Sequence, residues 1–171
     1  MLDQVLRRIA LASAAPALLV LAAPAEAKVP APDLPRHAPA SAIAPAVLMS
    51  EVVTMTNQRR AQHGCQPLAV SLDLTIASIR QSLYMARTGQ FSHVWRDGTT
   101  FLARSRAAGY QRPSGENIAW GYQTAADVME AWMNSPHHRQ NILNCDARSI
   151  GTGVAYAETG LPYYTETFGW D

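Results

Sequence analysis

Residues 150–168 read IGTGVAYAETGLPYYTETF, and this stretch near the C-terminus decides the fold class. Its two ends, residues 150–156 and 163–168, are rich in Val, Tyr, Thr and Phe, which favour β-strands. The residues between them, 158–162, contain Gly and Pro and suit a hairpin connection. The sequence therefore predicts an antiparallel pair of strands that closes the chain.

Helical patterns precede these strands. Apolar residues near helical spacing predict helices over residues 46–63 and 73–87, which Gly64 and Gly89 can end. A shorter helix is expected over residues 99–108, and residues 115–119 form a tight, extended segment. The second helix is expected to turn one apolar face inward, comprising Ile76, Ile79 and Leu83.

A further helix is expected after Thr124, which with Asp127 resembles a capping box. Val128, Ala131 and Trp132 form its expected inner face. The Ser-Pro pair at residues 135–136 ends this helix and can start another short one over residues 137–143. Helices first and strands last predict an α+β domain built in layers.

The N-terminal part of the chain has the composition of an export signal followed by a spacer. Residues 1–27 carry two arginines, an apolar run and an Ala-Glu-Ala cleavage site. A membrane anchor is the alternative, but Pro16 interrupts the apolar run and no charged stop follows. Residues 28–45 are rich in Pro and Ala and predict an extended tether. Residues 46–171 remain for one domain.

Two cysteines, Cys65 and Cys145, lie in the expected domain. Because an exported chain meets an oxidising compartment, an even cysteine count predicts one disulfide between them. The alternative is a catalytic thiol beside a histidine, which an even count in an exported protein disfavours.

Charge and motifs exclude several function classes. With 14 Lys and Arg against 13 Asp and Glu, the net charge of +1 provides no basic surface for nucleic acid. The sequence contains no H-E-x-x-H, G-x-S-x-G or S-x-x-K motif and no Gly-rich phosphate loop. The tryptophans could stack on sugars, although scattered aromatic residues are more often part of a core or its rim.

Three polar phrases remain: FSH at residues 91–93, GENIA at 115–119 and WMNSPHHRQNIL at 132–143. In this order and spacing they resemble the signature segments of the CAP superfamily, the SCP or pathogenesis-related-1-like domain, in its bacterial secreted form. The similarity extends over most of residues 46–171. It implies a CAP-type α-β-α sandwich with C-terminal antiparallel strands and a central cleft.

The resemblance implies that His93, Glu116 and His138 converge in that cleft. A second glutamate of the family's eukaryotic members is replaced by Ser135, so a function that needs two facing carboxylates is in doubt. Two imidazoles and one carboxylate leave an open position on zinc or another divalent metal. His138 would lie in the first turn of a helix, where a neutral ring is favoured. A purely structural cluster is the alternative, and no metal is expected to be required for folding.

The leading hypothesis is therefore a secreted, non-catalytic CAP-domain monomer. Its cleft would bind a divalent metal and an apolar, lipid, sterol or peptide ligand, with His93 and His138 as the metal ligands. The main alternative is a metal-dependent hydrolase with Glu116 as the base. A third is an extracellular adhesion or envelope-associated module in which the tether matters most. The expected location is extracellular, periplasmic or in the cell envelope, with no membrane span after signal cleavage.

Overall fold

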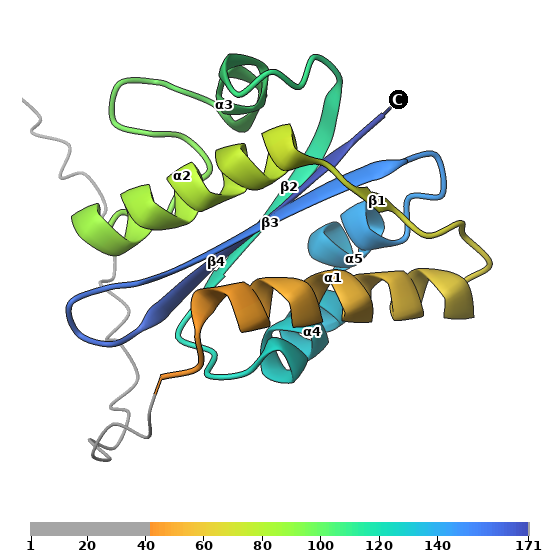
Figure 1. Cartoon of the computed structure of the whole chain (residues 1–171), viewed down its shortest axis with the longest axis horizontal. Coiled ribbons are helices and arrows are strands. Elements are labelled where there is room, and N and C mark those ends of the chain that lie inside the picture. The colour runs from red at the N-terminus through yellow and green to blue at the C-terminus, as the bar shows by residue number, and fades with distance from the viewer. Residues whose placement is uncertain (1–41, 171) are drawn as a thin grey trace, which may run out of the picture. The chain divides into compact units, whose positions relative to one another are not determined.

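The computed structural model describes residues 42–170, and its elements carry the labels of Figure 1. The expected export signal, residues 1–27, and residues 28–41 of the expected tether lie outside the described residues. The first helix, α1 (Pro45–Gln62), starts one residue earlier than the sequence indicated. A proline suits this first helical position because the N–H that it lacks would have no partner within the helix.

A four-stranded sheet forms the middle layer, with the strand order β1-β3-β4-β2. Its strands are β1 (Ala69–Val70), β2 (Pro113–Trp120), β3 (Ser149–Tyr156) and β4 (Pro162–Gly169). β1 pairs with β3 in parallel, whereas β3 with β4 and β4 with β2 are antiparallel. Tyr156 pairs with Pro162 across a short connection, so the predicted C-terminal hairpin is confirmed.

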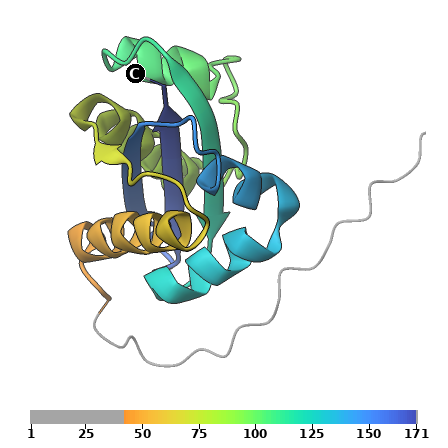
Figure 2. The same cartoon turned by 90° about the vertical axis from the view of Figure 1, so that its right-hand side faces the viewer.

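Helices cover both faces of this sheet (Figure 1, Figure 2). α1, α4 (Ala125–Asn134) and α5 (Pro136–Ile142) lie on one face, and α2 (Leu72–Thr88) lies on the other, with α3 (Phe101–Ala107) near the start of β2. This is the α-β-α sandwich of the α+β class that the resemblance implied. Within residues 42–170, no helix combines the length and the apolar character that crossing a membrane demands.

The face under α1 and α4 holds the main apolar core. Thr124 caps α4 by accepting a hydrogen bond from the backbone N–H of Asp127 at 3.2 Å, as the capping box predicted. Of the expected inner-face residues of α4, Val128 and Trp132 are buried, whereas Ala131 is only half-buried. The largest buried apolar side chains of this core are Leu48, Met129, Trp132, Ile142, Ile150, Tyr164 and Phe168.

On the other face, α2 comes unusually close to β3. A Cβ atom at Gly151 would lie 2.1 Å from the carbonyl carbon of Leu74, and one at Gly153 would lie 2.3 Å from that of Ser78. The hydroxyls of Ser78 and Ser82 donate to the carbonyls of Gly151 and Gly153 at 3.0 and 2.9 Å. Because β3 has no side chains at these two positions, the helix hydrogen-bonds directly to the backbone of the strand.

This contact shows that the apolar face expected for α2 was wrong. Ile76, Ile79 and Leu83 are only half-buried, whereas Ser78 and Ser82 are completely buried. A hydrophobic stripe marks the inner face of a helix when it packs on apolar side chains. Here the helix packs on a glycine-containing strand, which accepts small hydroxyl residues instead.

Cys65 and Cys145 form the predicted disulfide, with their Cα atoms 4.8 Å apart. It joins the segment after α1 to the segment after α5. The guanidinium of Arg60 is buried beside it and donates to four backbone carbonyls at 2.7–3.1 Å, those of Gln66, Ile142, Asn144 and Ala147. The covalent bridge and the buried cation therefore hold the same two segments together.

Gly153→Ala tests the close approach of α2. The added methyl group would meet helix backbone, which cannot rotate away, so we expect a loss of about 3 kcal/mol or more in the free energy of unfolding. The matched control is Ser82→Ala, which removes the hydrogen bond to the Gly153 carbonyl but leaves the spacing intact, with an expected loss of about 1–2 kcal/mol. Urea denaturation measures both, and a loss no larger for Gly153→Ala than for Ser82→Ala would contradict the argument.

Candidate functional site

His93 and Glu116 lie in direct contact, although 23 residues separate them in the sequence. His93 belongs to the loop between α2 and α3, and 49% of its side chain is exposed, whereas the side chain of Glu116 on β2 is 3% exposed. The Nδ1 atom of His93 lies 2.9 Å from Oε1 of Glu116. Because an ionised carboxylate can only accept, a neutral His93 ring donates from Nδ1 and keeps the lone pair of Nε2.

Arg104 of α3 holds the carboxylate of Glu116 in place. Its Nη2 atom lies 2.9 Å from Oε1 and 2.7 Å from Oε2 of Glu116, and its Nη1 donates to the carbonyls of His93 and Thr99 at 3.0 Å each. Arg104 is 3% exposed. One buried guanidinium therefore fixes both the acid and the loop that carries the histidine.

A second set of contacts anchors this loop to α2. The indole of Trp95 donates to the side-chain carbonyl of Gln81 at 2.6 Å, and the amide of Gln81 donates to the carbonyl of Ser92 at 2.7 Å. Trp95 also stacks on Tyr84, with 4.8 Å between ring centroids, and the guanidinium of Arg104 lies 5.5 Å from the centre of the Trp95 ring. The backbone on either side of His93 is thus held at several points.

His138 reaches the site from α5, and Asn117 positions that helix. The amide nitrogen of Asn117 donates to the carbonyl of His138 at 3.2 Å, and the amide of Asn141 donates to Oδ1 of Asn117 at 2.8 Å and to the carbonyl of Glu116 at 3.3 Å. Gly115 permits this approach, since a Cβ there would lie 2.7 Å from Oδ1 of Asn141. Burial, together with the charges of His93 and His137, lowers the pKa of His138 below its ordinary value.

Glu166 lies behind this network, completely buried at the centre of β4. It accepts hydrogen bonds from the hydroxyl of Thr56 and, at 3.2 Å, from the amide of Asn117. Burial raises its pKa to about 7, and the two hydrogen bonds and the charge of Arg60 only partly oppose that effect. A buried carboxylate therefore connects α1 to the strand that carries Glu116.

The structure places only two of the three predicted site residues in direct contact. His93 and Glu116 touch, whereas His138 is linked to Glu116 through Asn117 and Asn141. Among residues 42–170, no group of three or more His, Cys, Asp or Glu side chains has the arrangement of a metal site. Arg104 was not predicted as a site residue, because an arginine in a short helix has no distinguishing pattern.

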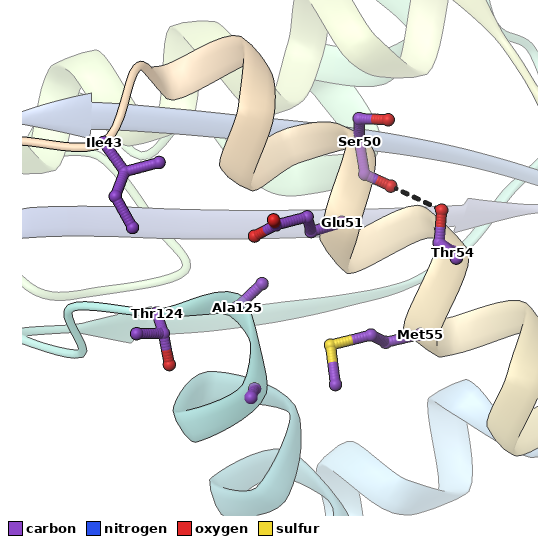
Figure 3. Close-up of a pocket in the computed structure, with 8 residues that line it drawn as sticks. Ile43, Ser50, Glu51, Thr54, Met55, Thr124 and Ala125 are labelled. Carbon is purple, nitrogen blue, oxygen red and sulfur yellow. Dashed lines mark hydrogen bonds between the residues drawn. The ribbon is translucent and has the colours of Figure 1, made fainter.

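Two concave regions of different character lie near these elements. A hollow of about 310 Å³ is bordered by Trp132, Ser135 and His138, and the hydroxyl of Ser135 makes no cap hydrogen bond to α5. A larger groove of about 510 Å³ lies between α1 and the start of α4 and has no lining residue in common with the hollow. Figure 3 shows Glu51 and Met55 of α1 extending toward α4 in this groove. His138 lines the hollow, whereas neither His93 nor His138 lines the groove.

A family model described as "CAP: Cysteine-rich secretory protein family" matches residues 53–168, which is more than half of the chain. The chain belongs to the CAP family. YkwD of Bacillus subtilis, an uncharacterized protein, is 38% identical over 112 residues, which are 64% of this CAP chain and 42% of YkwD. The membrane protein YlbC of the same organism, also uncharacterized, is 29% identical over 119 residues, 69% of this chain and 33% of YlbC. The chain thus spans less than half the length of either relative.

Solved structures agree with this assignment. An extracellular protein of Bacillus anthracis that contains an SCP domain superposes with a TM-score of 0.65 at 28% identity, over 74% of this CAP chain and 41% of that chain. An outer surface protein of Borrelia burgdorferi also has a TM-score of 0.65, at 21% identity, over 71% and 91% of the two chains. The second likeness supports the fold alone.

Arg104→Met tests the buried ion pair. Removing the guanidinium leaves the Glu116 carboxylate buried without its cation, so we expect a loss of about 3–5 kcal/mol in the free energy of unfolding. The double variant Arg104→Met/Glu116→Leu removes both charges and should recover most of that loss. Chemical denaturation measures both variants. A double variant no more stable than Arg104→Met would refute the charge-pair explanation.

Glu166→Gln tests the buried acid through pH. The pKa of Glu166 is about 7 in the folded protein, against an ordinary value of 4.5 in an unfolded chain, so the folded state binds more protons between these values. The stability that this group contributes is present below pH 4.5 and is lost as the pH rises through about 7. The unfolding free energy of wild type relative to Glu166→Gln should fall by roughly 2–3 kcal/mol between about pH 5 and about pH 8. A pH-independent difference would exclude this titration.

Proposed function

We propose that this CAP protein is an exported, non-catalytic binding protein that holds a divalent metal ion, zinc first among them, through His93 and His138. The observation that carries the proposal is the 2.9 Å contact between Nδ1 of His93 and Glu116. A carboxylate that accepts from one ring nitrogen of a histidine fixes the tautomer and raises the basicity of the other nitrogen, as found behind many metal-binding histidines. Nε2 of His93 is then the donor to the metal.

The donor set suits a weakly held, exchangeable ion. His93 is half-exposed and His138 lines a hollow, so both rings are accessible. The carboxylate of Glu116 is occupied by Arg104, which favours a role in orienting His93 rather than one as a direct ligand. An ion held by two imidazoles keeps coordination positions for water or for a ligand atom. The proposed site is therefore one at which a metal and a second ligand bind together.

The salt bridge from Nη2 of Arg104 to both carboxylate oxygens also argues against the alternative of a hydrolase with Glu116 as the base. A general base needs a pKa near the working pH and access to a substrate or its water. Glu116 is paired with a guanidinium through both oxygens, and its side chain is 3% exposed. We therefore favour binding over catalysis for this cleft.

Export is supported by two independent features. The disulfide between Cys65 and Cys145 is typical of proteins that fold in an oxidising compartment. The Bacillus anthracis protein at 28% identity is extracellular, and this CAP chain is proposed to share that location.

In the adhesion alternative, deleting residues 28–45 would abolish the biological effect of the protein, whereas His93→Ala would leave it intact.

Zinc titration by calorimetry tests the proposal. Wild type should bind one zinc ion, and the double variant His93→Ala/His138→Ala should show no heat beyond dilution. Glu116→Gln should bind about 10–100-fold more weakly, because the His93 ring loses its carboxylate partner.

The matched control for this titration is His137→Ala. His137 is exposed and adjacent to His138 in the sequence, so its removal should leave the zinc affinity within about twofold. Circular dichroism should confirm that every variant is folded. Equal heats for wild type and the double variant would eliminate the metal site.

A further inference from the structure

The hollow beside His138 has a sharply divided lining. Four aromatic side chains, Phe91, Trp120, Tyr122 and Trp132, contribute to its walls, whereas its polar end consists of Ser135 and His138. At about 310 Å³ it lies at the lower end of the range for ligand pockets. Its size therefore suits one amino-acid side chain rather than an oligosaccharide or a long acyl chain.

Two of the four aromatic side chains are held by contacts within the protein, and the other two are partly exposed. The indole of Trp132 donates to the carbonyl of Ile118 at 3.2 Å, and Trp120 stacks on Tyr163 with 6.2 Å between ring centroids. Phe91 is 46% exposed and Tyr122 is 37% exposed. Aromatic rings prefer offset-stacked or edge-to-face partners, so a planar apolar group is the best occupant of this hollow.

The backbone beside the hollow can also bind a peptide. β2 is an edge strand of the sheet, and the carbonyls of Glu116 and Ile118 point away from β4, since they accept from Asn141 and Trp132. In an antiparallel pair, alternate residues direct both backbone groups outward. Trp120, two residues further on, therefore presents its N–H and C=O on the same side. An extended peptide laid there can hydrogen-bond to the edge of β2.

The charge of the lining indicates whether the C-terminal carboxylate or the N-terminal ammonium group of a peptide would fit the hollow. No acidic residue is found among the described residues that line the hollow, and its only titratable groups are the imidazole of His138 and the phenol of Tyr122. A metal ion at His93 and His138 would add positive charge at the polar end. A free carboxylate is complementary to that end, and an ammonium group is not.

We propose that the hollow binds the C-terminal residue of a peptide that ends in an aromatic amino acid. Its ring fills the space between Phe91, Tyr122 and Trp132, and its carboxylate lies at Ser135 and His138, where a metal ion held by the proposed site would attract it. The carboxylate part of this proposal rests on the proposed function. The aromatic part rests on the hollow alone.

Ala131→Phe tests the proposal in the full chain. Ala131 is half-buried on α4 and lines the hollow, so a phenyl group there should fill it without removing an existing contact. The matched control is Ala126→Phe on the same helix, where Ala126 is exposed and borders the other groove.

The probes are N-acetyl-L-phenylalanine, its amide and octanoate, each titrated with zinc and with a chelator. Tryptophan fluorescence gives the signal, because two tryptophans line the hollow.

We expect N-acetyl-L-phenylalanine to bind wild type and Ala126→Phe equally, and Ala131→Phe at least about tenfold more weakly. Zinc should tighten binding of the acid about tenfold or more and leave the amide within about twofold. Phe91→Ala, a change in an exposed loop residue, should weaken binding of both the acid and the amide. It covers the case in which Ala131→Phe does not fold. Octanoate binding more tightly than N-acetyl-L-phenylalanine, or Ala131→Phe and Phe91→Ala both binding like wild type, would overturn the proposal.

The same titration separates this proposal from the proposed metal site. If zinc does not bind but Ala131→Phe still abolishes binding of the amide, the metal site fails and the aromatic hollow stands. If zinc binds with the predicted dependence on His93 and His138 but neither N-acetyl-L-phenylalanine nor its amide binds wild type, the metal site stands and the aromatic hollow fails.

Discussion

The close approach of α2 to β3 is the constraint on which the rest of the structure depends. Two positions without side chains, Gly151 and Gly153, let the helix lie directly on the strand backbone, where the hydroxyls of Ser78 and Ser82 hydrogen-bond to the buried carbonyls of these glycines. Gln81 and Tyr84 of the same helix hold the loop around His93. The distance between helix and sheet therefore also determines where that histidine meets Glu116.

β2 joins the two layers through consecutive polar residues. Glu116 is directed to Arg104 and His93, which follow α2 in the chain, whereas Asn117 is directed to α5 and to Glu166. Each of these groups is hydrogen-bonded, and all but His93 are buried, so displacing one side of the strand would leave charged or polar atoms unpaired on the other. The polar residues that define the candidate site are in this sense also part of the core.

The sequence predicted those features that have local signals. The hairpin, the cap of α4 and the disulfide follow from residue types and spacing, and the structure contains all three. β1 was missed because two residues are too short for a pattern. The inner face of α2 was predicted wrongly, because its partner is a bare backbone that favours serine over isoleucine. The contact of His93 with Glu116 followed only from the resemblance to the CAP family. Arg104 was missed because its partners lie in the loop before α3 and in β2, and no local pattern links them to it.

The disulfide between Cys65 and Cys145 has a consequence for resistance to proteolysis. The bridge spans 80 residues, and His93, Arg104, Glu116 and His138 all lie inside that covalent ring. A protease that cleaves the exposed loop around residue 97 would open the ring once, yet both pieces would stay attached to each other. The binding residues would then remain on one covalently connected molecule, and two cleavages within the ring would be needed to release any of them.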